Sequence, residues 1–339
     1  MGGFLSETSL SSNKDILNMP TTLILGAGLA GLTAARELTQ YNHNVLIVDK
    51  GRGVGGRLAT RRMADGRADH GGQYFSARSP EFQALTQKMM TAGVVREWHI
   101  EQSDPATFKH PRYVGANGMS SIAKYLAKDL TVQTGKRAVK IGQTTNGWEV
   151  IFDNGQTLAA DSLLVTLPAP QVLALWQESG LVLPADEQTA LETIQYQPCI
   201  AVMLQLSQPA NVPAPGGLKL PADSAVAWIA DNQQKGISPE ATTVTLHASH
   251  AYSQRHIDDA DSDALITELI ATVADYILPE TIVDQQIHRW RYSNATVRHG
   301  TPFLAASAHA PLFFGGDGFG QGNIEGAYLS GLAMARQLI

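Results

Sequence analysis

Apolar and amphipathic stretches follow one another near the start of the chain in a strand–helix–strand order. Residues 21–25 form a short apolar run with β-branched side chains, which is typical of a strand buried on both faces. Residues 32–40 read as a helix, and residues 45–48 form the next buried strand, which ends at Asp49. This order predicts an α/β fold that opens with a Rossmann-like unit.

The middle of the chain predicts two helices and several short strands. Helices are expected from Ser79 to about residue 91 and, capped by Ser120 or Ser121, up to residue 130. A small β-meander is expected over residues 132–139, 147–152 and 156–159, followed by a buried strand over residues 161–168.

Beyond residue 172 the pattern changes to alternating strands. Strands are expected over residues 200–206, 225–229 and 242–248, and a helix over residues 262–277. We therefore predict a second unit, built on a mixed or antiparallel sheet, that faces the substrate.

Composition narrows the class of protein. The chain has 339 residues, 44% of them hydrophobic, and 31 glycines, which fits a globular α/β enzyme with two domains or one elaborated domain. A net charge of −6 argues against nucleic acid, and no apolar run approaches the roughly 18 residues that cross a bilayer. Cys199 is the single cysteine, so a disulfide framework is excluded and a reducing, cytoplasmic location is expected. Residues 1–18 are polar and predict a disordered extension.

Three glycines after the first strand have the spacing of a dinucleotide-binding turn. Gly26 allows the tight turn, Gly28 lets a pyrophosphate approach the backbone, and Gly31 lets the helix pack against the strand. Free N–H groups at the start of the helix hold phosphate charge, and Asp49 can accept a hydrogen bond from a ribose hydroxyl. Because strand, helix and acid all surround the glycines, a dinucleotide site is favoured over an ordinary βα turn.

Two more glycine-rich stretches extend this predicted site. Residues 50–57 cannot pack a core, so they read as a loop that approaches phosphates closely, with Arg57 supplying charge; a basic surface loop is the alternative. Residues 312–318 read as a strand that ends in glycines and Asp317, and residues 322–331 open the final helix. The two similar patterns suggest one extended cofactor that bridges both ends of the chain.

These motifs resemble those of the amine-oxidase superfamily of flavoproteins. The shared residues are the three turn glycines, Asp49, the Gly55-Gly56-Arg57 loop and the late Gly316-Asp317 pair. Within the superfamily the chain is most similar to the renalases, particularly the bacterial ones, from about residue 20 to the end. The stretches that carry this likeness are residues 49–57, 72–78, 114–120, 168–171, 246–249, 289–290 and 326–331.

The resemblance implies FAD bound across a discontinuous Rossmann-like domain of residues 19–79, 111–171 and 295–339. It also implies a substrate domain of residues 80–110 and 172–294 that covers the isoalloxazine ring. The residues assigned to FAD are Gly26, Ala27, Gly28, Leu29, Ala30, Gly31, Asp49, Lys50, Arg52, Gly56, Arg57, Leu58, Gly72, Gln73, Tyr74, Val139, Thr166, Gly316, Asp317, Gly322, Asn323 and Ile324.

The activity implied by the resemblance is an oxidase. It would oxidise 2- or 6-dihydro isomers of NAD(P) to NAD(P)⁺ by hydride transfer to flavin N5, and O₂ would reoxidise the flavin to give H₂O₂. An oxidase or dehydrogenase of small amines and a non-catalytic flavin-binding redox protein stay open as alternatives. The expected partners are the small-molecule substrate and O₂, without nucleic acid or membrane, in a monomer or homodimer.

A labile hydride donor needs a flat pocket and no strong acid or base. His247 lies in the strand predicted over residues 242–248, and we expect it to hydrogen-bond the nicotinamide carboxamide or ribose; a core or surface histidine is the alternative. The aromatic candidates are Tyr74, Trp228, Trp290 and Tyr292, each of which could instead pack in the core. Asn232 and Arg289 are polar candidates, and no residue spacing indicates a metal site.

Two further residues bear on the chemistry. Cys199 lies in an apolar run far from the late flavin motif, through which the mitochondrial monoamine oxidases tether flavin, so noncovalent FAD is expected. Residues 193–206 also lack the lysine that many amine oxidases place under the flavin. This absence favours dihydronicotinamide oxidation over amine oxidation.

Overall fold

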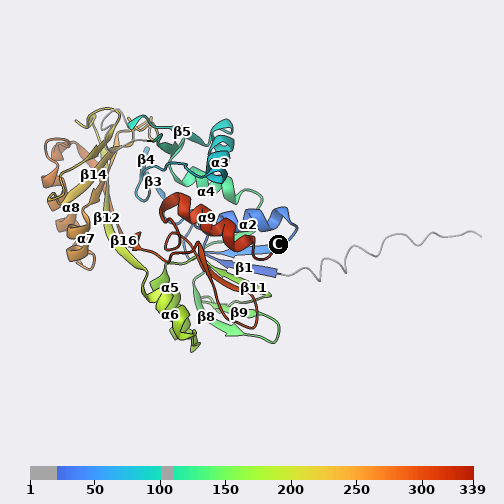
Figure 1. Ribbon diagram of the computed structural model, residues 1–339. Helices are drawn as coiled ribbons and strands as arrows, with labels where there is room; N and C mark the ends of the chain where they lie inside the picture. Colours follow the sequence, from blue (N-terminus) through green and yellow to red (C-terminus); the bar gives the residue numbers. More distant parts are fainter. Residues whose placement is uncertain (1–20, 101–109) are drawn as a thin grey trace, which may run out of the picture.

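The computed structural model describes residues 21–100 and 110–339, so the extension expected over residues 1–18 lies outside the described residues. Two sheets dominate the fold and lie side by side (Figure 1). The first has six strands in the order β17-β18-β11-β1-β2-β7. Its strands are β1 (Thr21–Leu25), β2 (Asn44–Val48), β7 (Val132–Gln133), β11 (Ser162–Val165) and β18 (Leu312–Gly315), all parallel, with β17 (Phe303–Ala305) antiparallel at one edge.

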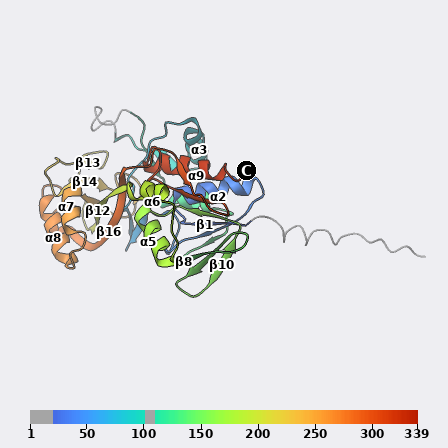
Figure 2. The ribbon, with the colours of Figure 1, turned by 60° about the horizontal axis from the view of Figure 1, so that its bottom comes forward.

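The parallel sheet is buried on both faces because its strands are apolar on both sides. Ile24, Ile47 and Leu164 pack in one cluster with the helices α2 (Leu29–Gln40), α4 (Ser120–Ala127) and α9 (Asn323–Ala335). Leu23 and Leu163 pack in another cluster on the opposite face, with a meander and two helices (Figures 1 and 2). These elements are β8 (Ala138–Gln143), β9 (Trp148–Phe152), β10 (Thr157–Ala160), α5 (Ala169–Ser179) and α6 (Ala185–Glu192).

The second sheet is antiparallel throughout, with the order β13-β14-β15-β12-β16. Its apolar face, with Ile200, Val202 and Leu246, packs on the helices α7 (His250–His256) and α8 (Ser262–Thr272). The strands are β12 (Gln195–Leu206), β13 (Gly217–Lys219), β14 (Val226–Asp231), β15 (Thr243–Ala248) and β16 (Ile282–Val297), with the short helix η3 (Pro279–Thr281) before β16. The other face of this sheet is turned toward the parallel-sheet unit.

A small hairpin joins the two units. It consists of β3 (Thr60–Met63) and β4 (Gly66–Asp69), and it lies against β15. The Thr243 hydroxyl donates to the Arg67 carbonyl at 2.5 Å, and the Thr245 hydroxyl donates to the Asp69 carbonyl at 2.9 Å. Helix α3 (Pro80–Thr91) and the pair β5 (Val95–Glu97) and β6 (Tyr113–Gly115) complete the described elements. None of the described helices is both long enough and apolar enough to span a bilayer.

Most predicted elements are confirmed, with corrections at their ends. Ser79 caps α3 as expected, because its hydroxyl accepts the Phe82 N–H. The prediction that Ser120 or Ser121 caps the next helix is wrong: the Thr60 hydroxyl accepts the Ser120 N–H from the hairpin, and the helix ends at Ala127. Residues 132–133 join the parallel sheet instead of the meander, and the helix expected to reach residue 277 ends at Thr272.

Helices α5 and α6 bear on where the second unit begins. Val172, Trp176 and Leu191 are buried in the cluster of the parallel sheet, although the sequence led us to expect residues 172–294 in the substrate domain. Helix α3 likewise packs in the cluster of α2 through Phe82 and Met89. We therefore propose that the substrate unit consists of β12–β16 with α7 and α8, and that it begins near residue 194.

Candidate active site

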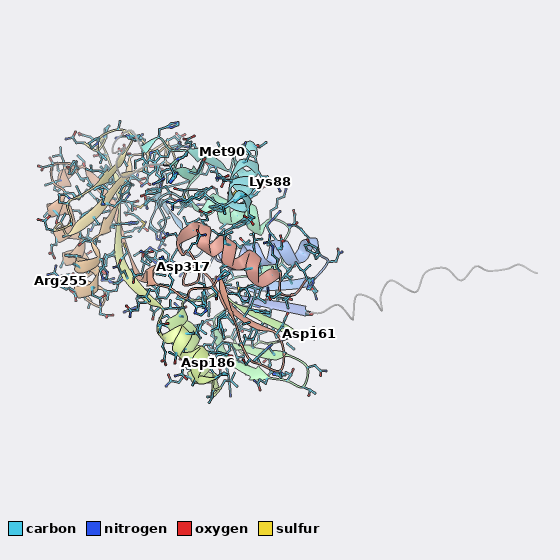
Figure 3. All side chains as sticks on the ribbon, viewed as in Figure 1. Lys88, Met90, Asp161, Asp186, Arg255 and Asp317 are labelled. Carbon is cyan, nitrogen blue, oxygen red and sulfur yellow. The ribbon has the colours of Figure 1, made fainter. Side chains whose placement is uncertain are left out.

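A continuous cavity of about 1890 Å³ is lined by both sheets and by the hairpin that joins them. His247 and the four aromatic candidates line it, and every FAD candidate lines it except Ala27, Gly31 and Val139. Figure 3 shows Asp317 near the middle of the molecule, where the two units meet. The cavity therefore brings together candidates from both ends of the chain.

The glycine turn after β1 has the geometry that a dinucleotide requires. Gly26 has φ +110°, a conformation open to glycine, and a Cβ on Gly31 would lie 2.0 Å from the Gly26 carbonyl oxygen. A Cβ on Gly28, in contrast, would meet no protein atom within 4 Å. Gly31 therefore serves close packing inside the fold, whereas Gly28 leaves open space on the cavity side that fits a pyrophosphate.

Asp49 connects this turn to the glycine-rich loop. Its Oδ2 accepts the Ala27 N–H at 2.6 Å and its Oδ1 accepts the Gly51 N–H at 2.6 Å. Ala27 thus does not line the cavity, but its backbone N–H binds the carboxylate of Asp49, which does. Val139 lies in β8 of the meander, outside the residues that line the cavity.

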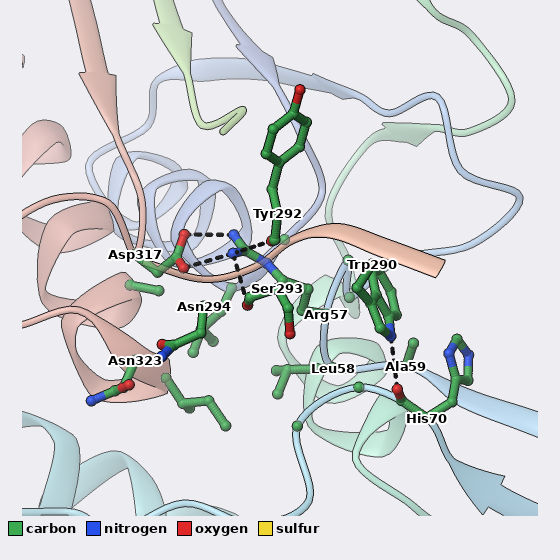
Figure 4. A pocket seen from close by; sticks show the side chains of 18 of the residues that line it. Arg57, Leu58, Ala59, His70, Trp290, Tyr292, Ser293, Asn294, Asp317 and Asn323 are labelled. Atoms are coloured by element: carbon green, nitrogen blue, oxygen red, sulfur yellow. Dashed lines mark hydrogen bonds and ion pairs between the residues drawn. The ribbon is translucent and has the colours of Figure 1, made fainter. Parts of the chain in front are cut away.

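Arg57 and Asp317 form a bidentate ion pair across 260 positions of sequence (Figure 4). The two nitrogen–oxygen distances are 2.6 and 2.5 Å, and Arg57 also donates to the Tyr292 carbonyl at 3.0 Å. The sequence predicted a role for each residue but not their contact. The pair ties the N-terminal loop, the end of β18 and strand β16 into one wall of the cavity.

The register of the antiparallel sheet explains which of its side chains face the cavity. Directly paired residues point to the same face of a sheet. Trp228 pairs with His247, His247 with Ala201, and Ala201 with His288, so these residues form one row across four strands. Trp228, His247 and His288 line the cavity.

A buried polar network supports His247 from behind. Gln73 Nε2 lies 3.4 Å from His247 Nε2 and donates to the Asp69 carbonyl at 2.7 Å. Lys235 Nζ donates to Asp69 Oδ2 at 2.8 Å and to Gln73 Oε1 at 3.3 Å, with both charged side chains fully buried. No sequence pattern indicates a role for Lys235, because it follows two glutamines in a polar turn that reads as exposed.

The histidines of the cavity are neutral near pH 7. Burial, and to a smaller extent the charge of Lys235, lowers the pKa of His247 to about 4. Burial also lowers the pKa of His70 to about 3, with His288 and Arg61 adding to the effect. Neutral rings can donate or accept hydrogen bonds but are not acids at this pH.

Aromatic rings surround this part of the cavity. Tyr74, Trp98 and Trp228 lie with ring centroids 5.8–6.2 Å apart. Trp290 stacks on His70 at 5.3 Å, and its Nε1 donates to the His70 carbonyl at 2.7 Å (Figure 4). These flat surfaces fit a planar substrate and ring cofactor.

Of the three remaining candidates, Tyr292 and Arg289 line the cavity and Asn232 does not. Tyr292 lines the cavity next to Tyr196, at 5.7 Å between ring centroids. Asn232 is buried and binds the Thr245 hydroxyl at 3.0 Å, and the Arg289 guanidinium binds the Ser262 hydroxyl at 3.1 Å. Asn232 does not line the cavity, while Arg289 does so with its guanidinium held by the residue that begins α8.

Cys199 is a free thiol in β12, and burial raises its pKa to about 12. The thiol therefore stays protonated at neutral pH and is a poor nucleophile. No group of His, Cys, Asp or Glu in the described part of the chain has the arrangement of a metal site.

The fold and the site together define an FAD-dependent oxidoreductase. The model of the flavin-containing amine oxidoreductase family matches residues 96–339, and the chain belongs to this family. The model of an NAD(P)-binding Rossmann-like domain matches residues 24–89.

Individual relatives are similar to this chain to different extents. Mouse renalase is 25% identical over 349 aligned residues, which cover 94% of this chain and 99% of renalase. A putative flavin-containing monoamine oxidase of Mycobacterium tuberculosis is 40% identical over 79 residues, 22% of this chain and 17% of that protein.

Solved structures share the fold over nearly the whole chain. A putative protoporphyrinogen oxidase from Exiguobacterium has a TM-score of 0.71 at 12% identity, and an engineered putrescine oxidase has a TM-score of 0.71 at 14% identity. Each alignment covers 94% of this chain and 98% of the other.

Proposed function

We propose that the protein is a renalase-type oxidase that converts 2- or 6-dihydro isomers of NAD(P) to NAD(P)⁺. The end-to-end likeness to mouse renalase supports the proposal. The observation that carries it is the charge of the cavity, which suits an anionic dinucleotide rather than a cationic amine. FAD is proposed to be held noncovalently by the turn glycines, Asp49, Arg57 and Asp317.

The acidic groups of the cavity are already occupied by protein partners. Those that line it are Asp49, Asp317 and Glu325. Asp49 accepts backbone N–H groups, Asp317 binds Arg57, and Glu325 accepts the backbone N–H of Ser79. Among the described lining residues, no carboxylate is left to bind the ammonium group of an amine.

Basic groups are far more numerous than acidic groups among the residues that line the cavity. The lysines and arginines that line the cavity are Lys50, Arg52, Arg57, Arg61, Arg62, Arg78, Arg112, Lys124, Lys219, Arg289 and Arg291. This excess stands in a chain whose net charge is −6. A cavity lined by one sign of charge attracts ligands of the opposite sign, here two pyrophosphate-containing molecules.

The residues around His247 suit a reaction without acid or base catalysis. FAD held at the turn glycines and Arg57 would supply the hydride acceptor and the route of two electrons to O₂, so that overall dihydro-NAD(P), O₂ and one proton would give NAD(P)⁺ and H₂O₂. The rings of Trp228 and Tyr74 hold the planar substrate and exclude water. Neutral His247, oriented by Gln73, hydrogen-bonds the carboxamide or ribose.

Anaerobic titration of the purified yellow holoenzyme tests this proposal. Bleaching of the flavin absorbance by 2- or 6-dihydro-NAD(P), with ordinary 4-dihydro-NADH and small amines inert, is the expected result. Bleaching by amines alone would establish the amine oxidase alternative. Bleaching by none of these donors would favour the flavin-binding redox protein.

A further inference from the structure

One basic residue of the cavity combines a buried guanidinium nitrogen with the lack of any side-chain partner among the residues that the structure describes. Arg61 lies in β3 and lines the cavity, but its guanidinium makes no hydrogen bond or ion pair with the residues that the structure describes, and its Nε is buried. Arg57 and Arg291, in contrast, bind carboxylates of the protein, and Arg289 binds the Ser262 hydroxyl although its Nε is also buried without a partner. A buried guanidinium nitrogen without a partner is costly, so it indicates a ligand.

A second unpartnered polar atom lies at the same place. His70 is 6% exposed and lines the cavity, and its Nδ1 is buried without a hydrogen-bond partner. Arg61 is close enough to His70 and His288 to lower the pKa of both rings, and the centroids of these two rings are 4.8 Å apart. A cationic fork and a ring N–H donor next to each other are the groups that bind a phosphate.

The sheet register gives the distance of the His288 side of this cluster from His247, whereas His70 lies next to His247, whose ring hydrogen-bonds the His70 backbone. His247 and His288 lie two strands apart in the same row, which is about 10 Å at the usual spacing between strands. That span corresponds to a ribose and its phosphate attached to a nicotinamide held at His247. We therefore expect Arg61, on the His288 side of the cluster, to lie near the diphosphate of a dinucleotide whose nicotinamide is held at His247.

We infer that Arg61 and His70 form a subsite for the diphosphate of the nicotinamide dinucleotide, separate from the groups that hold the FAD pyrophosphate. This inference rests on the proposed function for the identity of the substrate. It adds that the enzyme selects dinucleotides over nicotinamide ribosides through Arg61. Trp290, stacked on His70, keeps the imidazole in place.

Calorimetric titration of the holoenzyme with ADP-ribose measures the subsite without turnover. Arg61→Met is expected to weaken ADP-ribose binding by about 10- to 100-fold, the usual range for a lost charge-assisted contact. Arg67→Met is the matched control. It removes the same charge from the same hairpin, but Arg67 is exposed and lies outside the cavity lining, so binding is expected to change by less than twofold. The flavin spectrum of each variant reports retention of FAD.

Kinetics with two donors give the second readout. For Arg61→Met, the KM of the dihydro dinucleotide is expected to rise at constant kcat, whereas the KM of the dihydronicotinamide riboside stays unchanged. In the wild type, added salt should raise the KM of the dinucleotide alone. If Arg61→Met does not fold, Arg61→Gln and the wild-type salt dependence still decide the question.

Two results would overturn the subsite. One is equal loss of affinity in Arg61→Met and Arg67→Met, and the other is equal loss of dinucleotide and riboside turnover. The proposed function fails separately: ADP-ribose binding that depends on Arg61, in a protein that oxidises no dihydronicotinamide, would leave the anion site standing without that activity. Oxidation of both donors with no effect of Arg61 would leave the activity standing without the subsite.

Discussion

The two sheets present different groups to the cavity. The parallel sheet presents backbone to the cavity at Gly28, whose missing side chain leaves open space, and its strands are uniformly apolar. The antiparallel sheet presents a row of side chains, Trp228, His247 and His288, whose common direction depends on register. Backbone recognition leaves a local motif in the sequence, whereas recognition by register does not.

The largest expected effect concerns the glycine turn of the parallel sheet, where two glycines three residues apart can be compared. Gly31→Ala should abolish folding or FAD binding altogether, because its Cβ would lie 2.0 Å from the Gly26 carbonyl oxygen. Gly28→Ala should fold normally, since no protein atom lies within 4 Å, but lose much of its FAD affinity. Circular dichroism and flavin content per chain separate the two outcomes; identical behaviour would contradict the assigned roles.

The next largest effect concerns the ion pair that holds the hairpin. Lys235→Met should lower the free energy of unfolding by about 3–5 kcal/mol, because it leaves the Asp69 carboxylate buried without its cation. Denaturant titration of the holoenzyme measures this. Arg291→Met is the control, since it breaks the exposed Arg291–Asp258 pair, which has a similarly short 2.5 Å distance, and no measurable change is expected. A small effect at Lys235 would show that water reaches the pair.

Acid should destabilise the protein through the buried histidines of the cavity. The pKa of His247 is about 4 and that of His70 about 3, below the usual 6.5, so the unfolded chain binds more protons as the pH falls through 6.5. Stability is therefore full above pH 6.5 and declines toward the folded-state values, on the order of 1–2 kcal/mol per ring between pH 7 and 5. His70→Phe, which cannot take up a proton, should flatten the decline, whereas substitution of the exposed His250 by glutamine should not. An unchanged slope in His70→Phe would rule out this source.

The smallest expected effect is on catalysis. His247→Ala should reduce kcat/KM by about tenfold, the value of one hydrogen bond to the substrate, while FAD content stays unchanged. Its neutral form is the active one, so no inflection from His247 is expected between pH 6 and 8. Steady-state kinetics across this range measure both effects, and a catalytic efficiency equal to that of the wild type would refute the role.

The sequence predicted the parts of the molecule that rest on local rules. The glycine turn, the Ser79 cap and the strands of the parallel sheet follow from conformation and hydrophobicity over a few residues. The end of β7 and the cap of α4 depend on contacts with distant elements, such as the Thr60 hydroxyl, and there the local patterns misled.

The candidate site likewise contains residues that local motifs predicted and contacts between distant residues that they did not. Asp317 and His247 came from motif and resemblance, and both line the cavity. The pairing of Arg57 with Asp317, and of Lys235 with Asp69, could not be foreseen, because each joins residues more than 150 positions apart. Arg61 carried no signal beyond its charge, since only the fold shows that its guanidinium lacks a partner.

The long-range ion pair has a consequence for how the protein is made in the cell. Arg57 leaves the ribosome long before Asp317 is synthesised, and strand β18 completes the sheet only then. We therefore expect flavin to be bound only after residue 317 has been synthesised, and a message cut short before that residue to yield a colourless product.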